Sequence, residues 1–271
     1  MASAAMARWA PYRAVLASRL RSQTAYRGSF AADLFASLLT AGIELAEVWI
    51  VFSSVKVLGG LSLAGGMVLF GLASTSFSLA DLCVGHVDRL PRYILSGQFD
   101  VFYLRPQPLL AQLMTSEISL RRIARTLIGA VALVLGLSWA RVEWTLPAGL
   151  MLGLALVCGW ALFAAVFVAA AAAQFFLIRG DELVNAATYG GSYAARQPAS
   201  LFPVPLRLAF AFIVPAAFVA YLPTLVILGQ PGPDYLPSGL AWGLPAVAGI
   251  SWAVALVAWR CGVRHYQSGG G

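Results

Sequence analysis

Six long apolar stretches constrain the fold of this chain more than any other feature of its sequence. They cover roughly residues 31–55, 62–86, 123–140, 147–177, 207–229 and 239–262. A helix needs about 20 mostly apolar residues to cross the ~30 Å hydrocarbon core of a bilayer. The sequence therefore predicts an all-α polytopic membrane protein with six transmembrane helices.

The composition excludes the two main alternatives to a membrane protein. Hydrophobic residues make up 60% of the 271 residues and charged residues only 11%, whereas a globular protein is typically about 45–50% apolar and about 25% charged. A soluble protein of this size needs more charge on its surface, and a disordered chain has low hydrophobicity. A soluble enzyme and a disordered protein are therefore both excluded.

The charged residues indicate which way the predicted helices cross the membrane. The chain has 18 lysines and arginines against 11 acidic residues, a net charge of +7. All but two of the cations, Lys56 and Arg141, fall in or beside the N-terminal segment, the segments 87–122 and 178–206, and the C-terminus. Cytoplasmic loops are enriched in lysine and arginine, so we expect both termini to lie in the cytoplasm. The net charge then reflects topology, and we expect no nucleic-acid partner.

The segments outside the predicted spans differ in length. Residues 1–30 are basic, and their large apolar side chains recur at helical spacing, which favours a helix lying in the membrane interface; a basic tail with some helix is the alternative. Residues 31–271 are expected to form a single six-helix transmembrane domain. Because the outer loops are short, the predicted cytoplasmic loops over 87–122 and 178–206 are the places where a partner would bind.

The sequence lacks the residues that common catalytic and metal sites require. A nucleotide-binding P-loop needs a lysine after its glycines, and the only lysine, Lys56, stands between two valines. The two histidines pair by helical spacing with one cysteine each, Cys83 with His86 and Cys261 with His265, but a closed zinc site has four ligands. We expect no catalytic, metal or cofactor site in this chain.

Two acidic residues in the first predicted span need an explanation. Glu44 and Glu47 are three residues apart, so they share one face of a helix. A charge at the centre of a bilayer costs about 2.5–3.5 kcal/mol on the insertion scale, so this face is expected to line the protein interior or a cavity. The pair is a candidate substrate-pathway site for a cationic compound; a structural pair bonded to neighbouring helices is the alternative.

Small residues in the fourth predicted span indicate close helix packing. Gly149 and Gly153 form a small-xxx-small pair, and residues 169–173 are all alanine. Small side chains let helices approach closely in membranes. We therefore expect this span to pack against other helices of the protein.

The segment after the second predicted span resembles a known family. It reads Asp88-Arg89-Leu90-Pro91-Arg92-Tyr93-Ile94-Leu95-Ser96-Gly97-Gln98-Phe99-Asp100 and continues to Leu104-Arg105-Pro106-Gln107-Pro108-Leu109. This resembles a loop of ABC-2-type transporter permeases, in the subfamily that includes viologen-exporter-like proteins. Gln98 and Phe99 depart from the usual glutamate and leucine. The likeness continues in order through residues 27–30, 181–185 and 264–268.

The resemblance implies a permease subunit of an ATP-driven exporter in a bacterial inner membrane. Two copies of a separate ATPase chain would bind Mg-ATP, and a second permease subunit, the same chain or a paralogue, would complete the pathway for a hydrophobic or cationic small molecule. The loop would form a coupling helix whose contacts with the ATPase come from Arg92, Tyr93, Ile94, Gly97, Gln98, Phe99, Asp100 and Arg105. Asp181 and Glu182 would add a second cytoplasmic contact.

Two other functions remain open from the sequence. One is an ion-coupled secondary transporter that uses Glu44 and Glu47. Such proteins often carry inverted repeats, and no clear repeat relates residues 31–140 to 147–262. The other is a membrane scaffold without a transport role. Co-purification of an ATPase discriminates among the three.

Overall fold

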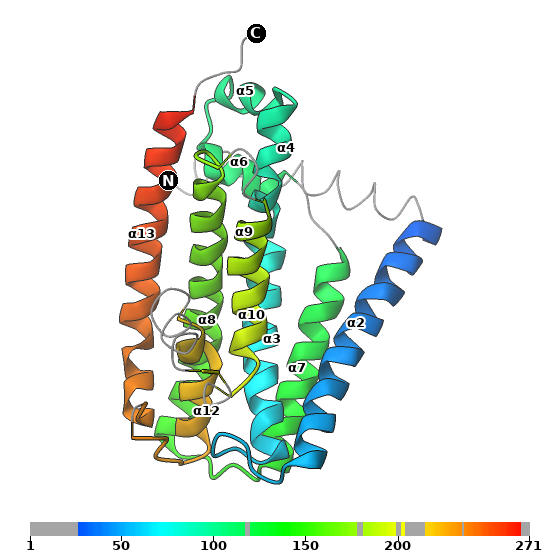
Figure 1. Ribbon diagram of the computed structural model, residues 1–271, viewed down its shortest axis with the longest axis vertical. Coiled ribbons are helices and arrows are strands. Elements are labelled where there is room, and N and C mark those ends of the chain that lie inside the picture. The colour runs from blue at the N-terminus through cyan, green and yellow to red at the C-terminus, as the bar shows by residue number, and fades with distance from the viewer. Residues whose placement is uncertain are drawn as a thin grey trace, which may run out of the picture.

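The computed structural model describes residues 27–116, 120–177, 181–198, 202–203, 215–234 and 236–266. Within these ranges the secondary structure is helical, apart from one isolated bridge between Leu58 and Leu61. Five helices are long and apolar enough to cross a membrane. They are α2 (Arg27–Ser54), α3 (Leu63–Val84), α7 (Leu120–Trp139), α8 (Leu146–Ala173) and α13 (Leu244–His265). The predicted all-α membrane class is confirmed (Figure 1).

The shorter elements connect these helices. They are η1 (Gly85–Arg89), α4 (Leu90–Leu95), α5 (Gln98–Tyr103), α6 (Leu109–Thr115), α9 (Asp181–Asn185), η2 (Ala186–Gly190), α10 (Gly191–Ala195), η4 (Ala217–Tyr221), α12 (Leu222–Ile227) and η5 (Ser238–Gly243). The expected interfacial helix in residues 1–30 lies almost entirely outside the described residues, as does the first half of the expected span at 207–229. The second half of that span forms η4 and α12.

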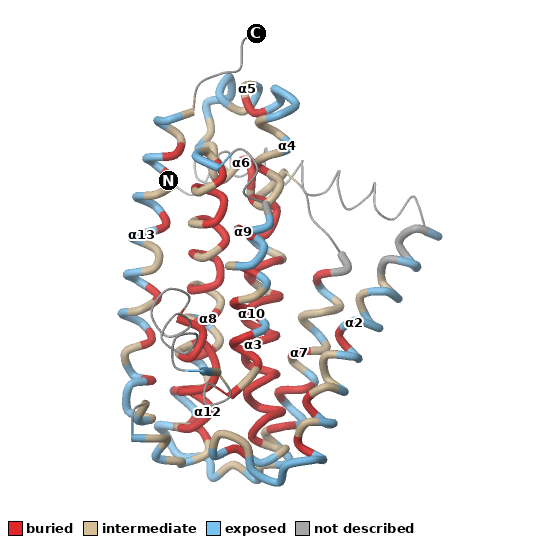
Figure 2. Tube along the Cα trace, viewed as in Figure 1, coloured by how far each residue is buried: buried red, intermediate tan, exposed pale blue. Residues whose placement is uncertain are grey.

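Helix α3 is the centre of the bundle. It packs against α7 on one side and α8 on another, and α8 in turn packs against α13. Most of α3 is buried, as Figure 2 shows by its colour. Its contact with α7 is close because glycines lack side chains there: a Cβ on Gly71 would collide with the backbone of Leu133, and one on Gly136 would lie 2.6 Å from the amide nitrogen of Val68. Small residues thus set the distance between these two helices.

The fourth span packs as expected, but through different residues. Ala170, Ala171 and Ala172 of α8 are buried. A Cβ on Gly149 or Gly153, by contrast, would meet nothing within 4 Å. Within the described residues this glycine pair packs against no other helix, because both glycines lie on the exposed side of α8.

Helix α2 lies at the edge of the bundle, where its main partners are α7 and α3 (Figure 1). Large apolar side chains along it, including Phe35, Ile43, Trp49 and Ile50, are exposed. Such a surface fits contact with lipid or with another membrane subunit, because neither requires polar side chains.

The segment expected to be a cytoplasmic loop at 178–206 requires a correction. Its described part, residues 181–198, runs as α9, the π-helical turn η2 and α10 beside α3 and α8. The ring of Tyr189 lies 5.7 Å from that of Phe77 on α3 and 6.3 Å from that of Phe167 on α8. The segment is polar and rich in glycine, so its hydropathy resembles that of a loop, yet its polar groups find partners inside the bundle.

Candidate functional site

A short helical hairpin stands at one end of the bundle. Helix α3 continues through η1 into α4, the chain reverses at Gly97, and α5 returns. Gly97 has a φ of 69°, a left-handed conformation that glycine adopts without a steric penalty. Figure 1 shows α4 level with the last turns of α13 and α5 beyond the end of that helix. We call residues 90–104 the α4–α5 hairpin.

The hairpin is fixed to the bundle by Phe99, which is fully buried. Its ring lies 4.8 Å from that of Tyr266, just after α13, and 5.5 Å from that of Phe175, just after α8. The rings of Phe102 and Tyr103 complete its surroundings. Phe99 was expected to contact an ATPase. In the structure it is instead an internal anchor, because burial removes the large apolar surface of its ring from water.

Hydrogen bonds add to this anchor. The hydroxyl of Tyr266 donates to Oδ1 of Asp100 at 3.0 Å, and that of Tyr103 donates to the carbonyl of Val263 at 3.1 Å. Burial, followed by the hydrogen bond to Asp100, raises the pKa of Tyr266 to about 12. Burial and then the charge of Asp100 raise the pKa of Tyr103. Both phenols therefore stay protonated and able to donate at neutral pH.

The outer surface of the hairpin is open. Leu95 and Leu104 are 73% and 85% exposed, and Val101 is also exposed. Large apolar side chains left exposed close together in the sequence are candidates for an interaction surface. We call these three residues the apolar tip of the hairpin.

The sequence-predicted contact residues are distributed over both sides of the hairpin. The exposed ones are Arg92, Gly97, Gln98 and Arg105, and the partly buried ones are Tyr93, Ile94 and Asp100. The guanidinium of Arg105 lies 5.7 Å from the ring centre of Phe102. Glu182 is exposed in the first turn of α9, whereas the side chain of Asp181 lies outside the described residues.

A cluster of charges links α2 to the rest of the bundle. A carboxylate oxygen of Glu44 lies 2.7 Å from Nη1 of Arg196, and the other lies 3.9 Å from Nη2 of Arg125. The hydroxyl of Tyr193 donates to the carboxylate of Glu47. Arg196 is buried, and its guanidinium also faces the ring of Phe70 at 5.8 Å. Glu47 thus bonds to α10, and Glu44 bonds to the residue that directly follows α10.

Sequence reasoning missed Arg196 as the partner of Glu44. The positive-inside pattern placed this arginine in a cytoplasmic loop together with the other cations. The available signal was the matched three-residue spacing of Glu44 and Glu47 on one segment and of Tyr193 and Arg196 on another.

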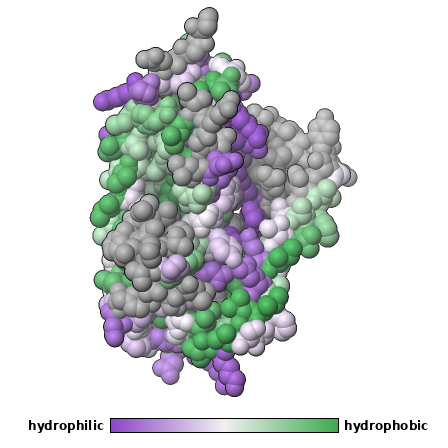
Figure 3. All heavy atoms as spheres, viewed as in Figure 1, coloured by the Kyte–Doolittle hydropathy of each residue, from purple (hydrophilic) through white to green (hydrophobic). Residues whose placement is uncertain are grey.

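A polar cavity of about 230 Å³ lies beside this cluster. Its lining consists of Ala36, Ser37, Thr40, Asp81, Arg122, Arg125 and Tyr189. Nε of Arg122 contacts Oδ2 of Asp81 at 3.0 Å, and its Nη1 donates to the Asp81 carbonyl at 2.8 Å. Figure 3 shows hydrophilic side chains gathered between α2 and the rest of the bundle. Polar and ionisable groups at such a place are typical of transport pathways.

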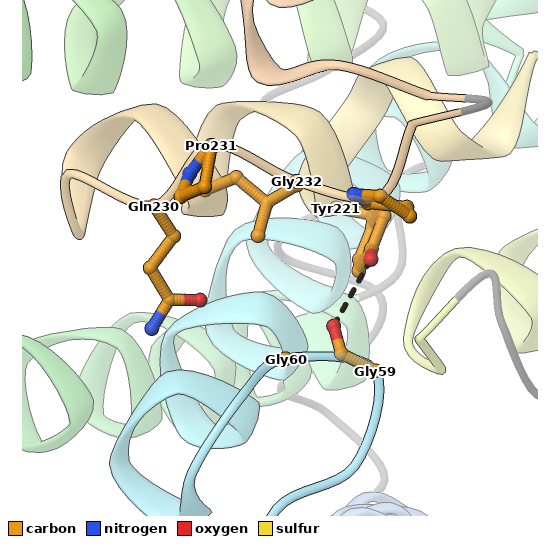
Figure 4. A pocket seen from close by; sticks show the side chains of 8 residues that line it. Gly59, Gly60, Tyr221, Gln230, Pro231 and Gly232 are labelled. Atoms are coloured by element: carbon orange, nitrogen blue, oxygen red, sulfur yellow. Dashed lines mark hydrogen bonds between the residues drawn. The ribbon is translucent and has the colours of Figure 1, made fainter.

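A second cavity, of about 510 Å³, lies at the end of the bundle opposite the hairpin. It is lined mainly by glycine, proline and apolar residues of two connecting segments and of the η4–α12 region. Figure 4 shows the hydroxyl of Tyr221 pointing to the carbonyl of Gly59, to which it donates at 3.0 Å. This hydrogen bond ties the segment after α2 to η4.

The comparisons with known proteins agree with a membrane transport component. The family model described as ABC-2 family transporter protein matches residues 38–270, which is most of the chain. No curated protein and no solved structure matches. ABC-2 proteins are the membrane components of ABC transporters; they work with an ATPase partner and are not themselves catalytic. The chain therefore belongs to the ABC-2 family of transporter proteins, as a multi-pass membrane permease component.

Proposed function

We propose that this chain is the permease of an ATP-driven exporter and that the α4–α5 hairpin receives the ATPase. The observation that carries the proposal is the hairpin itself. Its apolar tip is exposed beyond the long helices, while its inner face is held by the buried Phe99. A docking lever must combine a free outer surface with a stiff attachment, because a flexible loop would absorb the motion instead of passing it on.

The proposed assembly contains two ATPase chains, which carry Mg-ATP, and a second permease subunit, the same chain or a paralogue. We place it in a bacterial inner membrane with both termini in the cytoplasm. The hairpin and the end of α13 share one end of the bundle, and this end carries Arg92, Arg105 and Arg264. The opposite end carries Lys56 and Arg141. This distribution supports the orientation through the positive-inside rule.

The proposed substrate is a hydrophobic or cationic small molecule. The carboxylate of Glu47 supports a cationic substrate. It is bonded to a neutral phenol, that of Tyr193, and the side chain of Tyr193 is exposed. Glu44 is already compensated by Arg196 at 2.7 Å. This ion pair gives no support to ion-coupled secondary transport through Glu44, because a coupling site must leave its charge available to the ion.

The test is co-purification of the full chain, in detergent or nanodiscs, with the ABC ATPases expressed in the same cell. A non-hydrolysable ATP analogue and Mg²⁺ are present so that the ATPase is in its nucleotide-bound state. We expect a stable complex whose ATPase activity changes on association. A chain that never retains an ATPase under these conditions would overturn the proposal and favour a scaffold.

A further inference from the structure

The second helix of the hairpin is joined to the end of α13 by side chains alone. Helix α4 follows α3 through η1 without a break, so the chain itself connects them. Helix α5 has no such continuity with α13. Its links to α13 are the ring contacts of Phe99 with Tyr266, the hydrogen bond from Tyr266 to Asp100 and the one from Tyr103 to Val263.

One of these links ends on the last turn of α13, and the other two end on Tyr266, which directly follows the helix. The carbonyl of Val263 belongs to the last turn of the helix, where backbone carbonyls lack partners within the helix. The Tyr103 hydroxyl satisfies it. The ring of Tyr103 also stacks on that of Tyr266, with 6.0 Å between their centres. A displacement of α5 therefore reaches the backbone of α13 directly as well as through a side chain.

Helix α8 joins the same contact. Phe175 lies 5.5 Å from the ring of Phe99, 5.5 Å from that of Trp259 and 6.1 Å from that of Tyr266. Gly262 makes this possible, because a Cβ there would lie 2.5 Å from the Phe175 ring and 3.1 Å from the carbonyl of Ala172. The ends of α8 and α13 thus meet directly beneath α5.

We infer that Tyr266 is a positioning residue of the coupling machinery, which passes motion of α5 to α13. Two routes then leave the hairpin: the covalent route through η1 to α3, and the side-chain route through Tyr266 to α13. Helix α8 packs against both α3 and α13, so the two routes act on opposite sides of it. This inference rests on the proposed docking of an ATPase on the hairpin.

Hydrogen–deuterium exchange of the full chain in nanodiscs, with and without the ATPase and the non-hydrolysable ATP analogue, tests this role. In the unaltered chain, ATPase binding should slow exchange in residues 90–104 and also in the last turns of α13. In Tyr266→Ala the hairpin should still be protected, because the docking surface is intact, but the added protection of α13 should be lost. Tyr266→Phe keeps the ring and loses one hydrogen bond, so the added protection should fall by about fivefold.

Tyr221→Phe is the matched control. It also removes one tyrosine hydroxyl bonded at 3.0 Å, but at the opposite end of the bundle, and it should behave as the unaltered chain. Equal protection of α13 in the unaltered chain and in both Tyr266 variants would overturn the inference, as would the absence of any effect on α13 in the unaltered chain. If the ATPase does not bind to the unaltered chain at all, the proposed function itself is overturned. Should Tyr266→Ala fail to fold, Tyr266→Phe still decides the matter, because it keeps the ring and removes only the hydrogen bond to Asp100.

Discussion

Gly97 sets the turn of the α4–α5 hairpin through its backbone conformation alone. Its φ is 69°, and a Cβ at this position would meet no atom within 4 Å. Replacement by valine should therefore cost roughly 1–2 kcal/mol from left-handed strain, whereas asparagine, which tolerates this conformation, should cost less. Exchange of the hairpin amides measures the difference. Equal exchange in the two variants would show that the turn is not strained.

The phenol of Tyr266 gives the hairpin anchor a defined pH dependence. Its pKa is about 12, raised from the ordinary value of 10.0 by burial and by the hydrogen bond to Asp100. The folded state thus favours the protonated form, so this stabilisation is fully present below pH 10 and is lost as the pH rises through 12. A spectroscopic titration of the phenolates should show this late step. The difference between the unaltered chain and Tyr266→Phe should be one phenol that titrates near 12, and a difference that appears at the ordinary tyrosine pKa would contradict the contact.

The link between α2 and the segment around α10 includes the ion pair of Glu44 with Arg196, beside the hydrogen bond from Tyr193 to Glu47. Arg196→Ala should destabilise the protein by about 3 kcal/mol, the lower end of the range for breaking a buried pair, because the Glu44 side chain is 24% exposed. The double variant Glu44→Leu with Arg196→Met should recover most of this loss, because the buried guanidinium and its carboxylate are removed together and Arg125, which is 29% exposed, can be hydrated. Unfolding in denaturant measures both. A double variant as unstable as Arg196→Ala would contradict the ion-pair account.

The contact of α3 with α7 depends on glycine. Gly136→Leu places a side chain against the backbone of α3 and should cost about 1–3 kcal/mol by overpacking. Gly149→Leu, on α8, is the control, because its side chain would point into open space. Thermal unfolding in the same detergent compares the two. Equal destabilisation would mean that α3 and α7 are not packed as closely as described.

The apolar stretches predicted the long helices well, because hydrophobic length alone decides whether a helix can cross a bilayer. They failed at residues 181–198, where Tyr189, Tyr193 and Arg196 make the segment look like a loop. A polar residue inside a helical bundle can be recognised only when its partner is known. The partner of Arg196 is Glu44, which lies about 150 positions away along the chain, so the local sequence does not show it.

The candidate site was predicted as a segment but not in its details. The sequence indicated a coupling helix in this segment, but not the second helix, α5, that returns after Gly97. It did not distinguish Phe99, which is buried, from Leu95 and Leu104, which are exposed. The ring partners of Phe99 come from the ends of α8 and α13, and local pattern does not show contacts over such separations.

At the scale of the whole molecule, the two ends of the bundle differ in what they can do. One end carries the hairpin, its anchor on α8 and α13, and the arginines Arg92, Arg105 and Arg264. The other has short connections and the cavity beside Tyr221. Between them, a polar cavity and a charge cluster lie next to α2, at the edge of the bundle. In this arrangement the proposed ATPase-docking hairpin is at one end of the bundle, and the polar cavity is in the middle.

The most direct test of the account is the affinity of the ATPase for the nanodisc-embedded chain with a charge placed at the apolar tip. Leu104→Glu should weaken binding about tenfold or more, as for a residue at the centre of an interface. Leu146→Glu, which alters an equally large exposed side chain at the other end of the bundle, should bind as the unaltered chain does. Unchanged affinity in Leu104→Glu would contradict the docking of the ATPase on the hairpin.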